Sequence, residues 1–412
     1  MKPLLSWKLF VVVFVFAGVL RLWGAFDYNI MVRDETFYVP RALHLVQYGS
    51  NGNRNWFHPQ LNDIILAASI KVFGNNSVGW RMYSILFGTA SIFMLYLVAK
   101  QLYPESTVPL LSASLLAFDP FHIFFSRTAM TEPPAISFFL LFLYLMLQYC
   151  EKNRQTLVLA GIAMGLAIAT KAYFVFAIPV VVIYAYFRTT QRNNESKSAL
   201  LARFAVTLVL LPIGVYLISY FYWFGRGHTL LEFYQFRSDA FLIAQNFQYE
   251  NKELMAMGGK PWEWFLKPFA AGYELFSDGT AGRFMIEINN PLFRIPVLPA
   301  MCIVAVYAVK KRNVHWLLAP VLFSACYLLL LVVQRPIASY SAYVLLPFAY
   351  LALAHAVSIV ANVFKREKEV VAISLIMIVI SGCYLYPLAT GFLVPTALYE
   401  PILPFVHLIR VF

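Results

Sequence analysis

Residues 108–149 decide the fold class; they read VPLLSASLLAFDPFHIFFSRTAMTEPPAISFFLLFLYLMLQY. Two apolar runs, 108–125 and 133–149, are joined by the short polar connection 126–132. A helix needs about 17–25 mainly apolar residues to cross the hydrocarbon core of a bilayer, and both runs reach that length. The stretch therefore predicts two membrane-spanning helices that form a hairpin.

The rest of the chain follows the same pattern. Of its 412 residues, 61% are hydrophobic and only 13% are charged, whereas soluble domains average about 45–50% and about 25%. These values exclude a disordered chain, a coiled coil and a small disulfide-stabilised secreted domain. We therefore predict an all-α polytopic membrane protein with a single integral membrane domain over residues 1–412. Eleven apolar runs are expected to span: 9–25, 82–102, 108–125, 133–149, 156–170, 172–187, 204–224, 291–309, 314–334, 340–361 and 370–390.

The positive charges indicate how these spans are oriented. Fifteen lysines and arginines fall in short connections on the side of the N-terminus, and only Arg127, Lys171 and Arg335 fall in those on the other side. Short cytoplasmic loops are enriched in Lys and Arg. We therefore expect a cytoplasmic N-terminus and an extracytoplasmic C-terminus. The net charge of +12 then reflects topology, and no nucleic-acid partner is expected.

Two long outer segments, 26–81 and 225–290, hold most of the remaining charged groups. Both are rich in Trp, Tyr and Phe, which favour the headgroup region of a bilayer. We expect each segment to contain helices that lie in the membrane interface, one of them over residues 61–73.

Asp34 and Glu35 are adjacent carboxylates just beyond the first predicted span. Ionised groups close to a bilayer are costly unless they are paired or used. On a helix the two side chains point about 100° apart, so one can face a site while a partner holds the other. The alternative is a solvated loop in which Asp34 caps a helix. His58, which precedes Pro59, is either a further site residue or a surface histidine before a helix start.

The hairpin connection and the end of the fifth run supply further charged candidates. Arg127 and Glu132 either form a local ion pair, or Glu132 joins Asp34 and Glu35 at one outer site. Three carboxylates could bind a divalent cation, or one of them could act as a general base. Lys171 ends an apolar run, where it either extends towards the interface or neutralises a phosphate.

In this order the motifs resemble those of the GT-C superfamily of membrane glycosyltransferases, in the branch of protein O-mannosyltransferases and lipid A aminoarabinose transferases. The resemblance covers roughly residues 10–190. A Tyr343-Val344-Leu345-Leu346-Pro347 stretch before the tenth span adds to it. The ordered motifs are Arg-Leu-Trp-Gly at 21–24, Asp34-Glu35, His58-Pro59, Arg127 with Glu132, and Gly165 to Thr170-Lys171.

The resemblance implies an enzyme that transfers a sugar from a polyprenyl-phosphate-linked donor to an extracytoplasmic acceptor. Asp34 matches the position of the acceptor-activating base or metal ligand, Glu35 its acidic partner and Glu132 the second acidic position. His58 matches the histidine of the family's His-Pro-Pro pattern. The residues expected to bind the carrier phosphate or substrate are His58, Arg127, Lys171, Tyr343 and Arg335. By the same resemblance, residues 1–190 are the catalytic-motif half, and residues 191–412 contact carrier lipid and acceptor.

The sequence also departs from the family pattern. Gln60 replaces the second proline, and Ala342 stands where many relatives have an arginine, for which Arg335 or Lys267 could substitute. A bound metal, Mg²⁺, Mn²⁺ or Zn²⁺ on Asp34, Glu132 and His58, is left open. The chain is shorter than most relatives and is expected to lack a carboxy-terminal soluble domain.

The acceptor and the functional class have alternatives. A lipid or cell-envelope glycan is favoured as acceptor over a protein Ser/Thr hydroxyl, because no hydrophilic domain is expected to select a folded protein. The expected location is the plasma membrane, bacterial inner or archaeal. A transporter or flippase for a lipid-linked sugar is the rival function, although such proteins usually place their charges at mid-membrane and contain paired repeats. A catalytically inactive scaffold that binds carrier lipid is the third alternative.

Overall fold

The computed structural model describes residues 3–49, 58–104, 106–151, 155–192, 196–246, 261–266, 270–332, 337–402 and 406–410. The chain divides into two compact units, each built from segments that are distant in the sequence. Unit 1 comprises residues 1–28, 88–128 and 249–412, and unit 2 comprises residues 29–87 and 129–248. The predicted single membrane domain and its halves, residues 1–190 and 191–412, stay predictions.

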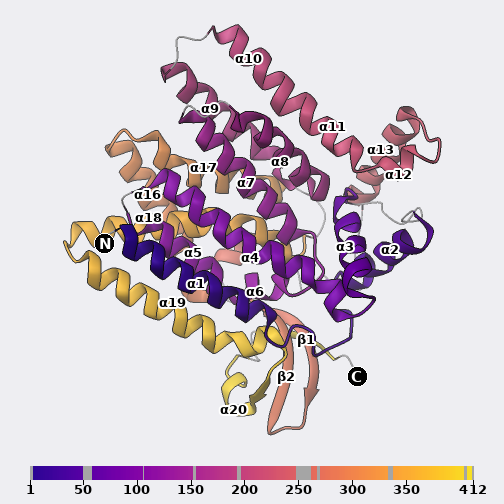
Figure 1. Ribbon diagram of the computed structural model, residues 1–412. Helices are drawn as coiled ribbons and strands as arrows, with labels where there is room; N and C mark the ends of the chain where they lie inside the picture. The colour runs from indigo at the N-terminus through magenta and orange to yellow at the C-terminus, as the bar shows by residue number, and fades with distance from the viewer. Residues whose placement is uncertain are drawn as a thin grey trace. The chain divides into compact units, whose positions relative to one another are not determined.

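Unit 2 is built from helices (Figure 1). Within it, α2 packs against α3, α7 packs against α8 and α9, and α8 packs against α11. The helix α3 has the bounds that the sequence predicted for an interfacial helix. The elements are α2 (Glu35–Tyr48), α3 (Leu61–Phe73), the first part of α4 (Ser77–Leu102), α7 (Glu132–Cys150), α8 (Thr156–Thr170), η2 (Ala172–Phe176), α9 (Ile178–Arg192), α10 (Lys197–Ala205), the π-helix η3 (Val206–Leu210), α11 (Leu211–Ile218), α12 (Phe221–Phe224) and α13 (Leu230–Asn246).

Unit 1 contains helices and a small sheet. The buried helix α18 lies at its centre and packs against α5, α16, α17 and α19. Its elements are α1 (Pro3–Leu22), the second part of α4, α5 (Val108–Phe118), α6 (Pro120–Ser126), η4 (Pro261–Phe265), β1 (Ala270–Ser277), β2 (Ala281–Ile288), α15 (Pro291–Arg294), α16 (Val297–Lys310), η5 (Val314–Leu317), α17 (Leu318–Val332), η6 (Ser339–Leu345), α18 (Leu346–Val363), α19 (Glu367–Thr390), β3 (Leu393–Pro395), α20 (Thr396–Tyr399) and β4 (Val406–Arg410).

The predicted apolar runs coincide with helices, but their lengths vary. Among the described residues, six helical segments are long and apolar enough to cross a membrane, and a bent pair of helices makes a seventh. The chain is therefore mainly helical with six or seven candidate spans. The count of eleven spans stays a prediction, because runs such as 156–170 form shorter helices.

The bent pair is α5 and α6, which meet at an angle of 63°. Asp119 is extended between them (φ −69°, ψ 116°), and its Oδ1 accepts a hydrogen bond from the backbone N–H of Phe121 at 3.0 Å. Pro120 disfavours helical geometry in the preceding residue and cannot donate to the backbone of α5. The sequence Asp119-Pro120 thus ends one helix and caps the next.

Arg21 donates hydrogen bonds to the carbonyl groups that the break between α5 and α6 leaves at the end of α5. Its guanidinium donates to the carbonyl oxygens of Ala117 (3.2 Å) and Leu116 (3.4 Å), which belong to the last turn of α5. It also donates to the carbonyl oxygen of Ala17 at 2.9 Å and is fully buried. The last carbonyls of any helix lack intrahelical donors and need other partners when buried. Arg21 supplies them within the apolar interior of unit 1.

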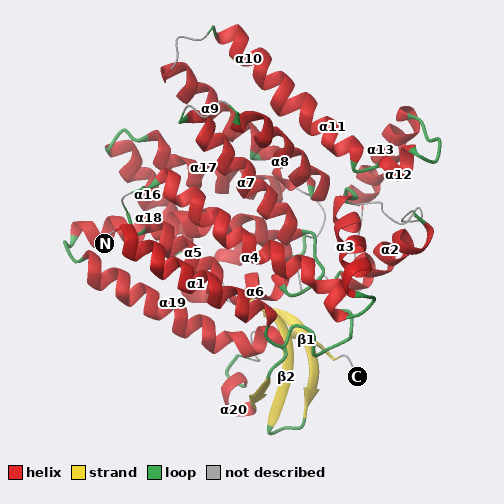
Figure 2. Ribbon diagram, viewed as in Figure 1, coloured by secondary structure: helices red, strands yellow, loops and turns green. Residues whose placement is uncertain are grey.

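The strands correct the all-α prediction. A four-stranded sheet has the order β3-β2-β1-β4, in which β1 pairs with β2 antiparallel and with β4 parallel (Figure 2). The turn between β1 and β2 contains Asp278-Gly279, and Gly279 has φ +85°. The Oδ1 atom of Asp278 accepts from the backbone N–H groups of Thr280 and Ala281 at 2.8 and 2.9 Å. Asp-Gly between apolar stretches is a strong hairpin signal, and the expectation of interfacial helices over 225–290 overlooked it.

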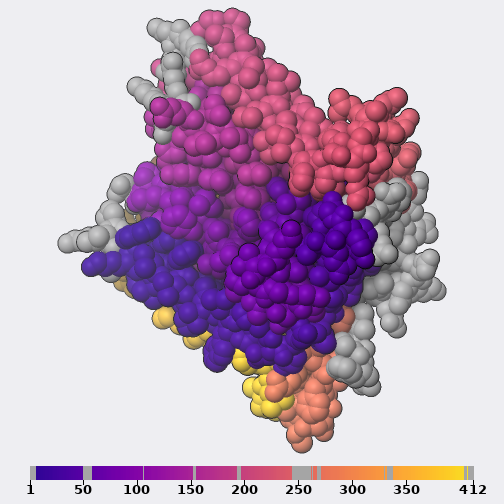
Figure 3. All heavy atoms as spheres, turned by 45° about the vertical axis from the view of Figure 1, so that its right-hand side comes forward, coloured from indigo at the N-terminus to yellow at the C-terminus, as the bar shows by residue number. Residues whose placement is uncertain are grey.

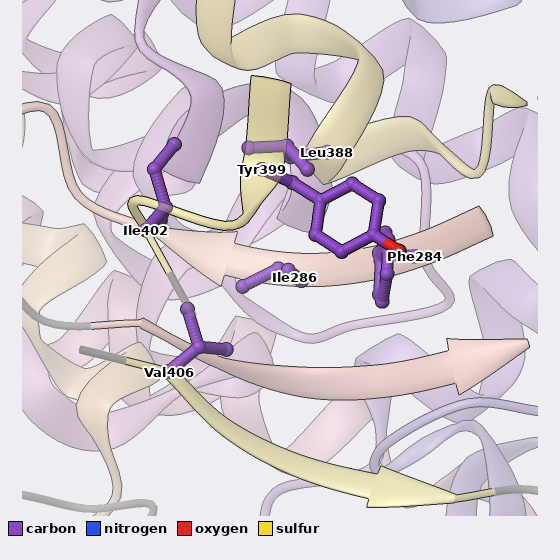
Figure 4. A pocket seen from close by; sticks show the side chains of 6 residues that line it. All are labelled: Phe284, Ile286, Leu388, Tyr399, Ile402 and Val406. Carbon is purple, nitrogen blue, oxygen red and sulfur yellow. The ribbon is translucent and has the colours of Figure 1, made fainter. Parts of the chain in front are cut away.

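The sheet packs on α19 through apolar side chains. Phe284 of β2 and Tyr399 of α20 meet edge to face, with ring centroids 4.6 Å apart. A narrow gap without room for a water molecule lies beside them (Figure 4). Because the side chains around it are aromatic or aliphatic, it belongs to the packing of unit 1, and the hydroxyl of Tyr399 lies 3.2 Å from Oγ1 of Thr396. The gap is lined by Phe284, Ile286, Leu388, Tyr399, Ile402 and Val406.

The role of Arg21 is testable by unfolding. Arg21→Met should lower the thermal unfolding temperature in detergent, because it leaves the carbonyls of Leu116 and Ala117 buried without donors, at about 1–3 kcal/mol each. Arg366→Met, which removes an exposed guanidinium from the same unit, is the matched control and should change little. Equal unfolding temperatures for the two variants would contradict this role.

Candidate active site

Glu35 is the best-satisfied carboxylate in unit 2. It is fully buried at the first turn of α2. Its Oε1 accepts from Arg81 Nε (2.9 Å) and from the backbone N–H of Ala129 (2.7 Å). Its Oε2 accepts from Arg81 Nη2 and from the backbone N–H of Val32, both at 2.9 Å. Four donors hold this carboxylate, so it fixes the start of α2 rather than facing an open site.

Asp34 is held differently from its neighbour. It occupies the N-cap position of α2, is half-buried, and its side chain makes no capping hydrogen bond. The preceding residue, Arg33, has φ +55°, a left-handed conformation that non-glycine residues adopt at a cost. The alternative in which Asp34 serves as a helix cap is therefore not supported by its geometry.

Two other residues predicted from the sequence, Glu132 and Lys171, influence the ionisation of Asp34. Desolvation is the largest effect and raises the pKa of Asp34, and the charge of Glu132 raises it further. Arg33, Lys171 and Arg41 act in the opposite direction. Charges act strongly on a group only over short distances. Asp34, Glu132 and Lys171 therefore lie in one electrostatic cluster within unit 2.

Glu132 and Lys171 form an ion pair in this cluster. Both are buried, and Lys171 Nζ donates to Glu132 Oε1. Thr131 Oγ1 donates to Glu132 Oε2 at 3.1 Å, and Lys171 Nζ lies 4.6 Å from the ring centroid of Tyr173. Burial is the largest single effect and lowers the pKa of Lys171, but Glu132, Tyr173 and Asp34 together raise that pKa above its usual value. Glu132 thus pairs with Lys171 at the end of α8. The alternative prediction, a local ion pair between Glu132 and Arg127, does not describe this carboxylate.

Tyr38 was not among the residues chosen from the sequence. It is buried one helical turn after Asp34, and the charges of Asp34 and Glu132 both act on its hydroxyl. The guanidinium of Arg41 lies 5.3 Å from its ring centroid, and the ring of His58 lies 6.3 Å away. The spacing i, i+4 and i+7 places Asp34, Tyr38 and Arg41 along one face of α2, which is the signal that could have identified them.

Tyr343 lies in unit 1 in a separate buried network. Its hydroxyl is 2.9 Å from Nε2 of His122, and the two rings stack at 4.8 Å. Arg21 Nη2 is 2.8 Å from Nδ1 of the same histidine. An arginine only donates, so Nδ1 must accept and Nε2 must carry the proton. Tyr343 is therefore positioned by His122, another residue that the sequence reasoning missed.

Arg127 also lies in unit 1, where its guanidinium donates hydrogen bonds mainly to backbone carbonyl groups. It donates to the carbonyl oxygens of Leu20 (2.9 Å) and Trp23 (2.6 Å) and to the hydroxyl of Tyr386 (3.0 Å). It is almost fully buried. Its predicted role in phosphate binding stays a prediction, while its contacts join the end of α1 to α19. Arg335 and Lys267 lie outside the described residues.

The open question of a metal can be tested on the donor set. Within the part of the chain that the structure describes, no three His, Cys, Asp or Glu side chains gather as ligands. Glu35 is occupied by Arg81 and Glu132 by Lys171. The group Asp34, Glu132 and His58 does not fit a three-ligand metal site in this arrangement, and no step below depends on a metal.

Known proteins resemble this chain both in sequence and in fold. Residues 57–216 match the family model of dolichyl-phosphate-mannose-protein mannosyltransferases. The solved Saccharomyces cerevisiae protein O-mannosyltransferase Pmt1–Pmt2 complex, bound to its sugar donor, matches with a TM-score of 0.79 at 12% identity. The match covers 95% of this chain and 91% of that chain. The resemblance to GT-C membrane glycosyltransferases is confirmed.

Curated relatives match part of this chain. An uncharacterized protein of Aquifex aeolicus is 28% identical over 186 residues, which cover 43% of this chain and 37% of that protein. The undecaprenyl phosphate-alpha-4-amino-4-deoxy-L-arabinose arabinosyl transferase of Pseudomonas aeruginosa is 26% identical over 219 residues, or 50% of this chain and 39% of that enzyme. The chain thus spans well under half the length of these two relatives. The structural match at 12% identity establishes the fold alone.

The buried pair Glu132–Lys171 predicts a specific pattern of stabilities. Glu132→Gln and Lys171→Met should each lower the free energy of unfolding by about 3–5 kcal/mol, because each leaves one buried charge without its partner. The double variant should be less destabilised than the sum of the singles. A thermodynamic cycle from chemical unfolding in detergent measures this coupling, and strict additivity would show that the two charges do not interact.

Proposed function

We propose that this GT-C protein transfers a sugar from a polyprenyl-phosphate-linked donor to an acceptor hydroxyl on the extracytoplasmic side of a membrane. The observation that carries the proposal is the contrast between two adjacent carboxylates. Glu35 is locked by Arg81, while Asp34 is half-buried, makes no capping bond and has a raised pKa. Perturbed carboxylates of this kind are typical of catalytic sites.

Asp34 is proposed as the general base. In the transfer it removes the proton of the acceptor hydroxyl, whose oxygen forms a bond to the anomeric carbon of the donor sugar. The bond from that carbon to the phosphate oxygen breaks, and polyprenyl phosphate leaves with the bonding electrons. A single displacement of this kind inverts the anomeric centre. General-base catalysis contributes about 10²–10⁴-fold to such reactions.

The remaining residues of the cluster are proposed to serve the leaving group and the base. Lys171 would stabilise the negative charge that grows on the departing phosphate, and to do so it must share its ammonium between Glu132 and that phosphate. Tyr38 is a neutral donor at the same place, and His58 lies beside it. Glu132 tunes the charge of Lys171 and raises the pKa of Asp34. The predicted contact of Tyr343 with substrate or carrier lipid stays a prediction.

The topology and the acceptor are also proposals. The positive-inside bias supports a cytoplasmic N-terminus, eleven spans and an extracytoplasmic Asp34 in a plasma membrane. The matched family is named for protein mannosylation and one relative for arabinosyl transfer. We infer a lipid or envelope glycan as the favoured acceptor and a protein hydroxyl as the alternative that an acceptor panel distinguishes.

The raised pKa of Asp34 predicts a pH-dependent rate. The base acts only when ionised, so kcat/KM should rise with pH through a pKa above the usual value near 3.9 and then level off. Asp34→Asn should remove this acidic limb and lower the transfer rate from undecaprenyl-phosphate mannose by about 10²–10⁴-fold. Asp239→Asn, which alters an exposed carboxylate of α13, should behave as wild type.

Stability provides an independent check on the same side chain. A carboxyl group whose pKa is raised by folding favours the folded state most below its unfolded pKa, and this contribution is lost as pH rises through the folded pKa. At neutral pH, Asp34→Asn should therefore unfold at the same or a higher temperature than wild type. A variant that is both active and less stable would contradict the proposed role of Asp34.

A further inference from the structure

The helix α3 begins with buried polar side chains. Gln60, Asn62 and Asp63 at its start are at most 1% exposed. The apolar Leu66 and Ile70 further along α3 are buried as well, while Val72 near its end is 73% exposed. Figure 3 shows the first part of the chain, drawn in indigo to violet, at the surface of the face in view. Because buried polar side chains need hydrogen-bond partners, the start of α3 is where partners have to be accounted for.

Three amide atoms at the start of α3 have no hydrogen-bond partner among the described residues. Oε1 of Gln60 and both Oδ1 and Nδ2 of Asn62 are buried without a partner. The hydroxyl of Tyr83 lies near Asn62, but it donates to the carbonyl oxygen of Met130 at 3.1 Å. Leaving buried amide groups unpaired costs folding free energy, and such groups therefore point to a missing partner.

A charged pair adjoins the two amides. Arg41 Nη2 donates to Asp63 Oδ2 at 2.5 Å and so connects α2 to α3. Arg41 also lies over the ring of Tyr38 and is one of the charges that act on Asp34. The polar start of α3 is therefore next to the proposed catalytic base, and both belong to unit 2.

The chemistry of these groups suits a ligand with many hydroxyls. Two amides, a carboxylate and a guanidinium offer donors and acceptors in fixed planes, as sugar hydroxyls require. Whatever the acceptor is, the transferred group is a sugar whose anomeric carbon must lie beside Asp34. We propose that Gln60, Asn62 and the Arg41–Asp63 pair bind the ring hydroxyls of the transferred sugar. This inference rests on the proposed function and adds the residues that select its donor.

The test compares sugar-bearing and bare carrier lipid. The full-length protein in detergent is titrated with undecaprenyl-phosphate mannose, undecaprenyl-phosphate aminoarabinose and undecaprenyl phosphate. Gln60→Met and Asn62→Leu should each weaken binding of the preferred sugar donor about tenfold, the loss expected for one hydrogen bond to a ligand. Their affinity for undecaprenyl phosphate should not change. Gln148→Met is the matched control, since it makes the same chemical change on α7, where the amide donates to Tyr144.

The possible outcomes separate the two proposals. If wild type binds the sugar donors no more tightly than undecaprenyl phosphate and transfers neither sugar, the proposed function fails, and this inference fails with it. If wild type prefers and transfers one sugar but the variants keep that preference, only the sugar site is overturned. Equal weakening of all three lipids in the variants would also overturn it, because the amides would then serve the fold. Retained unfolding temperatures in the variants exclude misfolding as the cause of a selective loss.

Discussion

The contact between Glu35 and Arg81 is the constraint on which the rest of the site depends. It joins the start of α2 to α4 through two hydrogen bonds of 2.9 Å, and the backbone of Val32 and Ala129 completes the shell of the carboxylate. A buried ion pair is stable only when further hydrogen bonds compensate for the lost hydration. Because Glu35 is fixed, it also fixes the adjacent Asp34, on which the charges of Glu132 and Lys171 act.

The electrostatic balance of the cluster follows from burial. Asp34 resists ionisation because it is desolvated and close to Glu132, while Arg33, Arg41 and Lys171 oppose this effect. A base with a raised pKa holds its proton more strongly once it has taken it. The pairing of Glu132 with Lys171 compensates both charges where the two side chains are buried. The same residues therefore account for the cost of the site to the fold and for its proposed chemistry.

The sequence predicted the helical membrane fold and most of the cluster because those features are local. Apolar runs give spans, and rare charges near a bilayer give candidate sites. The pair of carboxylates Asp34 and Glu35 was recognised in the sequence. The sequence did not show that Glu35 is the one bound by Arg81, because Arg81 is 46 residues away in the chain. Tyr38 and Arg41 follow Asp34 on one helix face and could have been found. The Asp278-Gly279 turn was a readable hairpin signal, whereas the roles of Arg21 and His122 depend on contacts between distant segments.

The central claim is that the ionised Asp34 side chain removes the acceptor proton, and chemical rescue tests it most directly. Single-turnover transfer from undecaprenyl-phosphate mannose should be measured with wild type and with Asp34→Ala, with and without added formate. A small carboxylate can enter the space that the truncated side chain leaves and act as the missing base. The account predicts a large loss of transfer in Asp34→Ala and partial recovery with formate, together with unchanged donor binding. Transfer by Asp34→Ala at the wild-type rate without formate would contradict it.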